Sequence, residues 1–191
     1  MNTIACKLTG KLVQMRIIKE EDWDIYLYGI RQGIVLLYNT VVVLAVSLLF
    51  QMVLQSLVFT VAYGLLRTTA GGYHARTQRN CNILSVILII TVLSILKWVP
   101  WSTSACIALS VLSGIIVFCL APVEDENKPL DAKEKTVYKK RVRVVLCAIM
   151  AVFVAFLIIG SITITSCIAL SVFFAAFMLV MGSIKNKLRE S

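Results

Sequence analysis

The residues best suited to chemistry are His74 and Cys81, which lie seven positions apart in a short polar stretch between long apolar runs. A histidine titrates near neutral pH and can take the proton of a thiol, and the thiolate is the nucleophilic form of cysteine. His74 is the only histidine of the chain. Positive charge also favours a thiolate, and three arginines surround the pair: Arg67, Arg76 and Arg79. The pattern predicts a cysteine nucleophile that a histidine activates.

The spacing of the pair sets a condition on the backbone. On an unbroken helix, residues seven apart share a face but lie about 10 Å apart along the axis, at ~1.5 Å per residue. That separation is too long for a hydrogen bond between imidazole and thiol. We therefore expect the backbone to bend or loop between Ala70 and Asn80. Gly71 and Gly72 can adopt the unusual dihedral angles of such a bend, and their amides could donate to an oxyanion.

Few groups are available to orient His74. No Asp or Glu occurs between Asp24 and Glu124, so a carboxylate would have to come from a distant part of the chain. The nearest amide side chains are those of Gln78, Asn80 and Asn82. Asn takes this part in some thiol sites. A purely structural interpretation stays open, in which His74 is an ordinary interfacial residue and Cys81 a packing residue.

The elements that must position this pair are membrane helices. The chain has 191 residues, of which 59% are hydrophobic and 15% charged, and its mean hydropathy is +0.88. These values are too apolar for a soluble domain. Uncharged runs occupy residues 32–66, 82–96, 102–121, 144–160 and 162–181. Each of the last four is near the ~20 residues of a spanning helix. We expect an all-α polytopic membrane protein, with residues 1–191 forming one integral membrane domain.

The N-terminal residues 1–31 have a different character. Their apolar side chains recur at helical spacing among mixed charges, at Ile4, Leu8, Leu12 and Met15. This pattern predicts an amphipathic helical region at the cytoplasmic face of the membrane, with a helix that holds substrate as the alternative. The region lacks the pattern of a removable signal peptide. The six cysteines are dispersed, and their spacing indicates neither a disulfide framework nor a metal site.

The basic residues predict the topology. They gather in four groups, at residues 7–31, 67–79, 128–143 and 185–189. By the positive-inside rule these groups are cytoplasmic, whereas the turns at Lys97 and near Gly160 are external. The 32–66 run must then cross twice, as a helical hairpin that turns near Gln51, Gln55 and Ser56. A partly re-entrant element is the alternative. The result is about six spans, four of them in 82–181, with a cytoplasmic N-terminus and a cytoplasmic tail at 182–191.

The polar stretch resembles the AgrB family, the membrane cysteine endopeptidases of peptide quorum sensing in Gram-positive bacteria. The matching residues are Arg67, Gly71, Gly72, His74 and Ala75, with Cys81 seven positions after the histidine. A second segment, residues 121–130, resembles the loop that follows a middle span in that family. The resemblance implies that His74 and Cys81, in a catalytic segment at 67–81, are the catalytic pair on the cytoplasmic side. Residues expected to support them or to position substrate are Arg67, Gly71, Gly72, Arg76, Arg79 and Asn80.

The resemblance also implies a reaction. The substrate would be a propeptide of the AgrD type, with an amphipathic leader, a signal region that contains Cys or Ser, and an acidic C-terminal tail. Cys81 would form a thioester as the tail leaves, and the peptide's own Cys or Ser would close a thiolactone or lactone. No cofactor, metal or nucleic acid is expected. The expected partners are the propeptide, the bilayer and, as an open question, a second copy of the chain.

Two other functional classes remain open from the sequence. A membrane peptide transporter or exporter could have this number of spans, although it would more often show charged or broken segments in both halves. A non-catalytic membrane scaffold would need neither His74 nor Cys81. The basic run at 139–143 is interpreted as a topology anchor, with recognition of an acidic peptide as the alternative.

Overall fold

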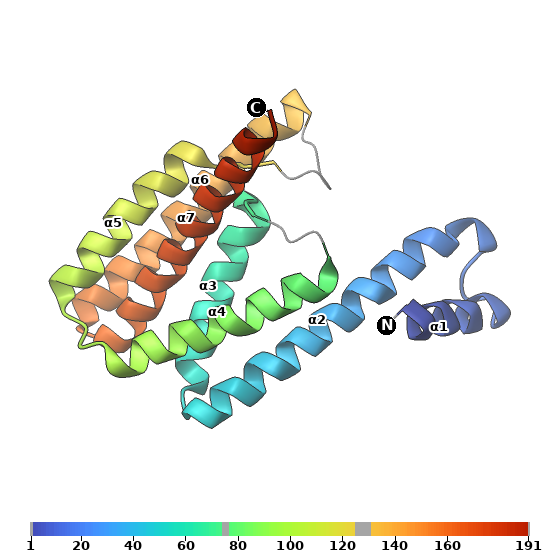
Figure 1. Cartoon of the computed structure of the whole chain (residues 1–191), viewed down its shortest axis with the longest axis horizontal. Coiled ribbons are helices and arrows are strands. Elements are labelled where there is room, and N and C mark those ends of the chain that lie inside the picture. Colours follow the sequence, from blue (N-terminus) through green and yellow to red (C-terminus); the bar gives the residue numbers. More distant parts are fainter. Residues whose placement is uncertain (1, 74–76, 125–130, 191) are drawn as a thin grey trace. The chain divides into compact units, whose positions relative to one another are not determined.

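The computed structural model describes residues 2–73, 77–124 and 131–190 (Figure 1). These residues form seven α-helices and one short 3-10 helix. The elements are α1 (Asn2–Gln14), η1 (Glu20–Asp22), α2 (Trp23–Phe50), α3 (Val53–Ala70), α4 (Gln78–Trp98), α5 (Thr103–Leu120), α6 (Ala132–Ile159) and α7 (Ile162–Glu190). Every regular element within the described ranges is helical, so the predicted all-α class is confirmed.

Six helices of the described chain, α2 to α7, are long and apolar enough to cross a membrane. The four spans predicted after residue 81 fall on α4, α5, α6 and α7. The predicted number of about six spans is therefore confirmed, and the chain is a polytopic membrane protein.

The 32–66 run is divided between two helices. The break lies at Gln51 and Met52, where Gln51 has a φ of 59° and its amide donates to the Leu48 carbonyl at 3.0 Å. The helix that follows, α3, is continuous over 18 residues. At ~1.5 Å per residue it is about 27 Å long, close to the ~30 Å hydrocarbon core of a bilayer. The geometry thus favours two helices over a re-entrant element.

Residues Met1–Val46 and Ser47–Ser191 form two compact units, and each is described by itself. In the first unit α1 has one buried edge at Ala5 and Thr9, while Ile4 and Leu8 are exposed. This distribution agrees with the expected amphipathic character of the region. The following helix begins at Trp23, so it includes residues that we expected to belong to the surface region.

The second unit is organised around α7. Of its most apolar window 67% is buried, whereas no other candidate span in the described residues exceeds 28%. Figure 1 shows α7 alongside α3, α5 and α6, and all three helices pack against it. Small residues line its buried face and let neighbouring backbones approach closely: Ala169, Ser171, Ala175 and Ala176. The helix at the centre is therefore the one that can contact most of the others.

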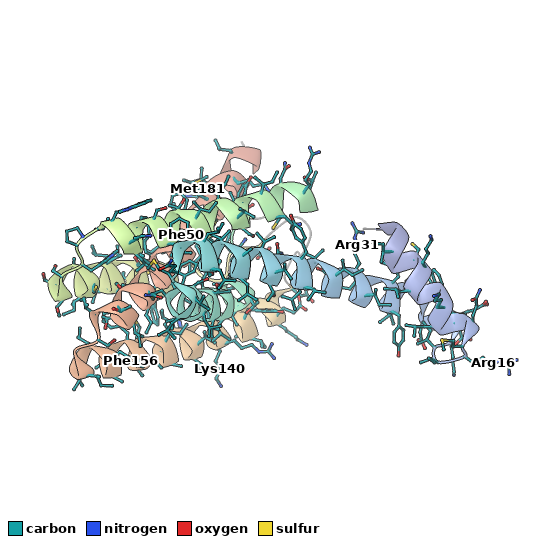
Figure 2. All side chains as sticks on the ribbon, turned by 90° about the horizontal axis from the view of Figure 1, so that it is seen from below. Arg16, Arg31, Phe50, Lys140, Phe156 and Met181 are labelled. Carbon is teal, nitrogen blue, oxygen red and sulfur yellow. The ribbon has the colours of Figure 1, made fainter. Side chains whose placement is uncertain are left out.

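The last two helices are longer than their apolar runs. The first turn of α6 follows Asp131, whose amide donates to the Glu134 carboxylate at 3.2 Å, and the helix continues through the basic run. Figure 2 shows Lys140 pointing outward from α6. Between α6 and α7 the chain turns at Gly160, which has a φ of 80°. The helix α7 continues to Glu190, so residues 182–190 of the expected cytoplasmic tail are helical.

Candidate functional site

The helical backbone breaks in the range, Ala70 to Asn80, where we expected a bend or loop. Helix α3 ends at Ala70 and α4 begins at Gln78. The first residues of the connection, Gly71 and Gly72, have φ values of 73° and 107°. L side chains rarely adopt such angles, and a Cβ atom on Gly71 would overlap the Val123 carbonyl oxygen. The two glycines are therefore required by the path of the chain, and the expected bend is confirmed.

The residues at 71–73, called here the 71–73 segment, lie between two other parts of the backbone. On one side the Val123 amide donates to the Ala70 carbonyl at 3.0 Å, and the Gly72 amide donates to the Val123 carbonyl at 3.2 Å. On the other side the Tyr73 amide donates to the Met178 carbonyl of α7 at 2.9 Å. The segment is thus held by the α5–α6 connection and by the central helix.

These bonds correct one expectation from the sequence. We expected the amides of Gly71 and Gly72 to be possible donors to an oxyanion. The Gly71 amide instead donates to the Arg67 carbonyl at 3.2 Å, and the Gly72 amide is used by Val123. Since each backbone N–H has one proton to donate, neither amide is free to bind an oxyanion in this structure.

The side chain of Arg67 binds the backbone of the 71–73 segment. It lies in the last turn of α3, and its guanidinium donates from Nη1 to the Gly71 carbonyl and from Nη2 to the Tyr73 carbonyl. Hydrogen bonds from a charged donor are stronger than neutral ones, and a planar guanidinium can make two at once. The structure thus places Arg67 as a clamp on the backbone that leads into His74.

Cys81 lies near the start of α4. The Cys81 amide donates to the Thr77 carbonyl at 3.1 Å, and the Thr77 side chain caps the helix by accepting from the Asn80 amide at 3.3 Å. Cys81 is half-buried and is a free thiol. The side chain of Tyr63 on α3 lies near both Arg67 and Cys81. The thiol and the Arg67 clamp are therefore brought to the same region of the second unit.

The other predicted site residues fall into two groups. Arg79 and Asn80 lie in the first turn of α4 with exposed side chains. His74 and Arg76 lie outside the described residues. The pairing of His74 with Cys81, and the identity of the group that orients His74, stay predictions.

Further contacts gather other elements at the same end of the second unit. Glu124 forms an ion pair with Lys135 of α6 at 2.6 Å, and its carbonyl accepts from the Asn186 side chain of α7 at 2.9 Å. The ammonium of Lys185 lies 5.2 Å from the centre of the Tyr73 ring. The polar stretch, the α5–α6 connection and the end of α7 thus meet at one end, and each of them belongs to or adjoins a basic group.

Several residues of this region were not found from the sequence. Tyr63 precedes Arg67 by four positions, and helical periodicity would have placed both on one face of α3. Gly182 directly follows the apolar run at 162–181, and small residues in a membrane helix can allow close backbone approach. The Met178 carbonyl carries no sequence signal, because any residue could supply it.

Several known proteins are similar to this chain. The family model AgrB, Accessory gene regulator B, matches residues 5–179. An AgrB-like protein of Clostridium perfringens is 28% identical over 147 residues, which cover 70% of this chain and 67% of that protein. Protein FsrB of Enterococcus faecalis is 27% identical over 128 residues, which cover 62% of this chain and 50% of that protein.

A third relative is Accessory gene regulator protein B of Staphylococcus intermedius, which is 22% identical over 146 residues, or 76% of this chain and 78% of that protein. No solved structure matches the chain significantly. The family match covers nearly all of the chain, including both resembling segments and all six candidate spans in whole or in large part. The chain therefore belongs to the AgrB family, the accessory gene regulator B proteins of quorum sensing, and is a multi-pass membrane protein.

Proposed function

We propose that this protein is a membrane cysteine endopeptidase that removes the C-terminal tail of a quorum-sensing propeptide and cyclises the remaining peptide. The observation that carries the proposal is the family match across residues 5–179, which includes both His74 and Cys81. Geometry supports it: α3 ends at Ala70 and α4 begins at Gln78, so His74 and Cys81 do not share one continuous helix, and Cys81 lies near the start of α4, close to Tyr63.

In the first half of the proposed reaction, His74 takes the proton of Cys81. The thiolate attacks the carbonyl carbon of the peptide bond before the tail, and the protonated His74 returns the proton to the amine of the leaving tail. A thioester then joins Cys81 to the last residue of the signal region. This step breaks one amide bond and forms one thioester bond.

In the second half, the thiol or hydroxyl of the peptide's own Cys or Ser attacks the thioester carbonyl. His74 takes the proton of that nucleophile, and Cys81 leaves as the thiol. Exchange of one thioester for another keeps most of the acyl free energy, so ring closure to a thiolactone needs no nucleotide. The expected partners are an AgrD-type propeptide and the bilayer that holds its leader.

The competing function is peptide transport without cleavage. It differs from the proposal in a single measurable product, the free tail. Purified protein in liposomes, given a synthetic propeptide with a labelled C-terminal tail, is expected to release the tail. Mass spectrometry of an acid-quenched sample is expected to show a peptide attached to Cys81. Transport of intact peptide with no released tail would contradict the proposal.

We also propose that the N-terminus, the polar stretch, the 122–143 region and the C-terminus are cytoplasmic. Asn2→Cys, Thr77→Cys and Ser161→Cys are each placed in an otherwise cysteine-free variant. In intact cells an impermeant maleimide is expected to label position 161 and to spare positions 2 and 77, because basic groups stay on the cytoplasmic side. Labelling at position 2 with protection at position 77 would mean that the 32–66 run crosses only once.

A further inference from the structure

The central helix α7 approaches the 71–73 segment more closely than a side chain would permit. A Cβ atom on Gly182 would lie 2.7 Å from the Tyr73 nitrogen, 2.8 Å from the Gly72 carbonyl carbon and 3.0 Å from the Gly72 Cα. The contact is reciprocal, since a Cβ atom on Gly72 would lie 2.9 Å from the Met178 carbonyl oxygen. Two backbones therefore meet directly, with glycine on both sides.

Both backbones are held in place by other contacts. The 71–73 segment is bonded to Met178 through the Tyr73 amide, to Val123 through the Gly72 amide, and to Arg67 through two carbonyls. On the other side, α7 is the most buried candidate span of the described chain and packs against three helices. A methyl group at position 182 must therefore displace the 71–73 segment, and strained packing of this kind propagates because protein interiors are tightly filled.

We propose that Gly182 is a positioning residue for the catalytic pair, an inference that rests on the proposed function. Because position 182 has no side chain, the backbone of α7 can pack directly against the 71–73 segment. His74 follows Tyr73 directly in the chain, so a shift of the 71–73 segment moves the point from which the chain continues to the expected catalytic pair. A misplacement of about 1 Å in a catalytic group can cost about 100-fold in rate.

A purely structural role makes a different prediction. Alanine is a better helix former than glycine, so Gly182→Ala does not weaken α7 itself. Gly114 of α5 offers a matched control, because it is a buried helical glycine whose added Cβ would have no neighbour within 4 Å among the atoms considered. Gly114→Ala makes the same chemical change without the backbone contact.

The test uses full-length protein in liposomes, with activity expressed per molecule of inserted protein. Gly182→Ala is expected to lower kcat for tail release by at least ~10-fold while KM changes little, because the substitution is proposed to act on the position of the catalytic pair. Gly114→Ala is expected to behave as the parent. A Gly182→Ala protein with the parent's kcat per molecule, at whatever level it accumulates, overturns the proposal.

A second readout needs no substrate. The pH dependence of iodoacetamide alkylation at Cys81 is measured in a background that lacks the other five cysteines. Gly182→Ala is expected to shift the rate profile in the same direction as His74→Ala, and an unshifted profile overturns the proposal. Failure of the proposed function is a separate result, in which the parent releases no tail and equals Cys81→Ala.

Discussion

Replacing Cys81 by Ala is expected to abolish release of the propeptide tail, with a loss of at least ~1,000-fold, because in the proposed mechanism the Cys81 thiol is the group that forms the thioester. His74→Ala is expected to cause a comparable loss, since a thiol without its base attacks a peptide bond poorly. Residues that act as one unit are not additive, so the double variant is expected to be no worse than Cys81→Ala alone. Initial rates of tail release in liposomes, at equal amounts of inserted protein, measure the effect.

The control for this prediction is a variant in which the other five cysteines are replaced. All six are free thiols, and Cys106 and Cys167 are buried among the helices. Replacing the other five together by Ser or Ala is expected to leave substantial activity. Cleavage that persists in Cys81→Ala would refute the mechanism, even if the protein still belongs to the family.

Arg67→Ala is expected to reduce tail release by about 100-fold, because the 71–73 segment loses the guanidinium that joins two of its carbonyls. Hydrogen bonds to charged groups contribute about 1.5–3 kcal/mol each, so the loss destabilises the loop by a comparable amount. Arg67→Lys is expected to restore little, since one ammonium lacks the planar fork that reaches both oxygens. Steady-state kinetics of the two variants, with the thermal stability of each purified protein, measure these effects.

Arg141→Lys is the matched control, because Arg141 is exposed on α6 and the change keeps its charge. It is expected to leave kcat and KM unchanged. If Arg67→Lys were as active as the parent, the clamp would have no role in positioning. If both Arg→Lys variants lost activity equally, the effect would be general to the protein and unrelated to the loop.

The two segments that resemble the AgrB family contact each other in the structure. Val123, in the second segment, exchanges backbone hydrogen bonds with Ala70 and Gly72 of the first. Glu124 then joins this connection to α6 through Lys135 and to α7 through Asn186. Several helices thus contribute to one end of the second unit. A substitution in one of them can alter the position of the 71–73 segment without changing any contact of Cys81.

Hydrophobic runs and basic groups in the sequence determined the class, the number of spans and the position of most helices. Long apolar runs have few stable alternatives to helices in a bilayer, where every backbone amide must be bonded within the protein. The break after Ala70 was also predicted from local information, namely two adjacent glycines and the expected pairing of residues seven positions apart. The lengths of α6 and α7 did not follow, because both helices continue into charged residues that hydropathy assigned to loop and tail.

Only the tertiary structure decided what holds the 71–73 segment in place. Its partners are the carbonyls of Val123 and Met178 and the bare backbone at Gly182, which lie far away in the sequence. Backbone groups are common to nearly all residues, so their pairing leaves no trace in residue types. The sequence predicted Arg67 as a supporting or substrate-positioning residue, but it did not show that the guanidinium binds the Gly71 and Tyr73 carbonyls, because those partners are main-chain oxygens. Residue types thus predicted the chemistry of the site, while the close packing of helices around α7 set the geometry of the 71–73 segment.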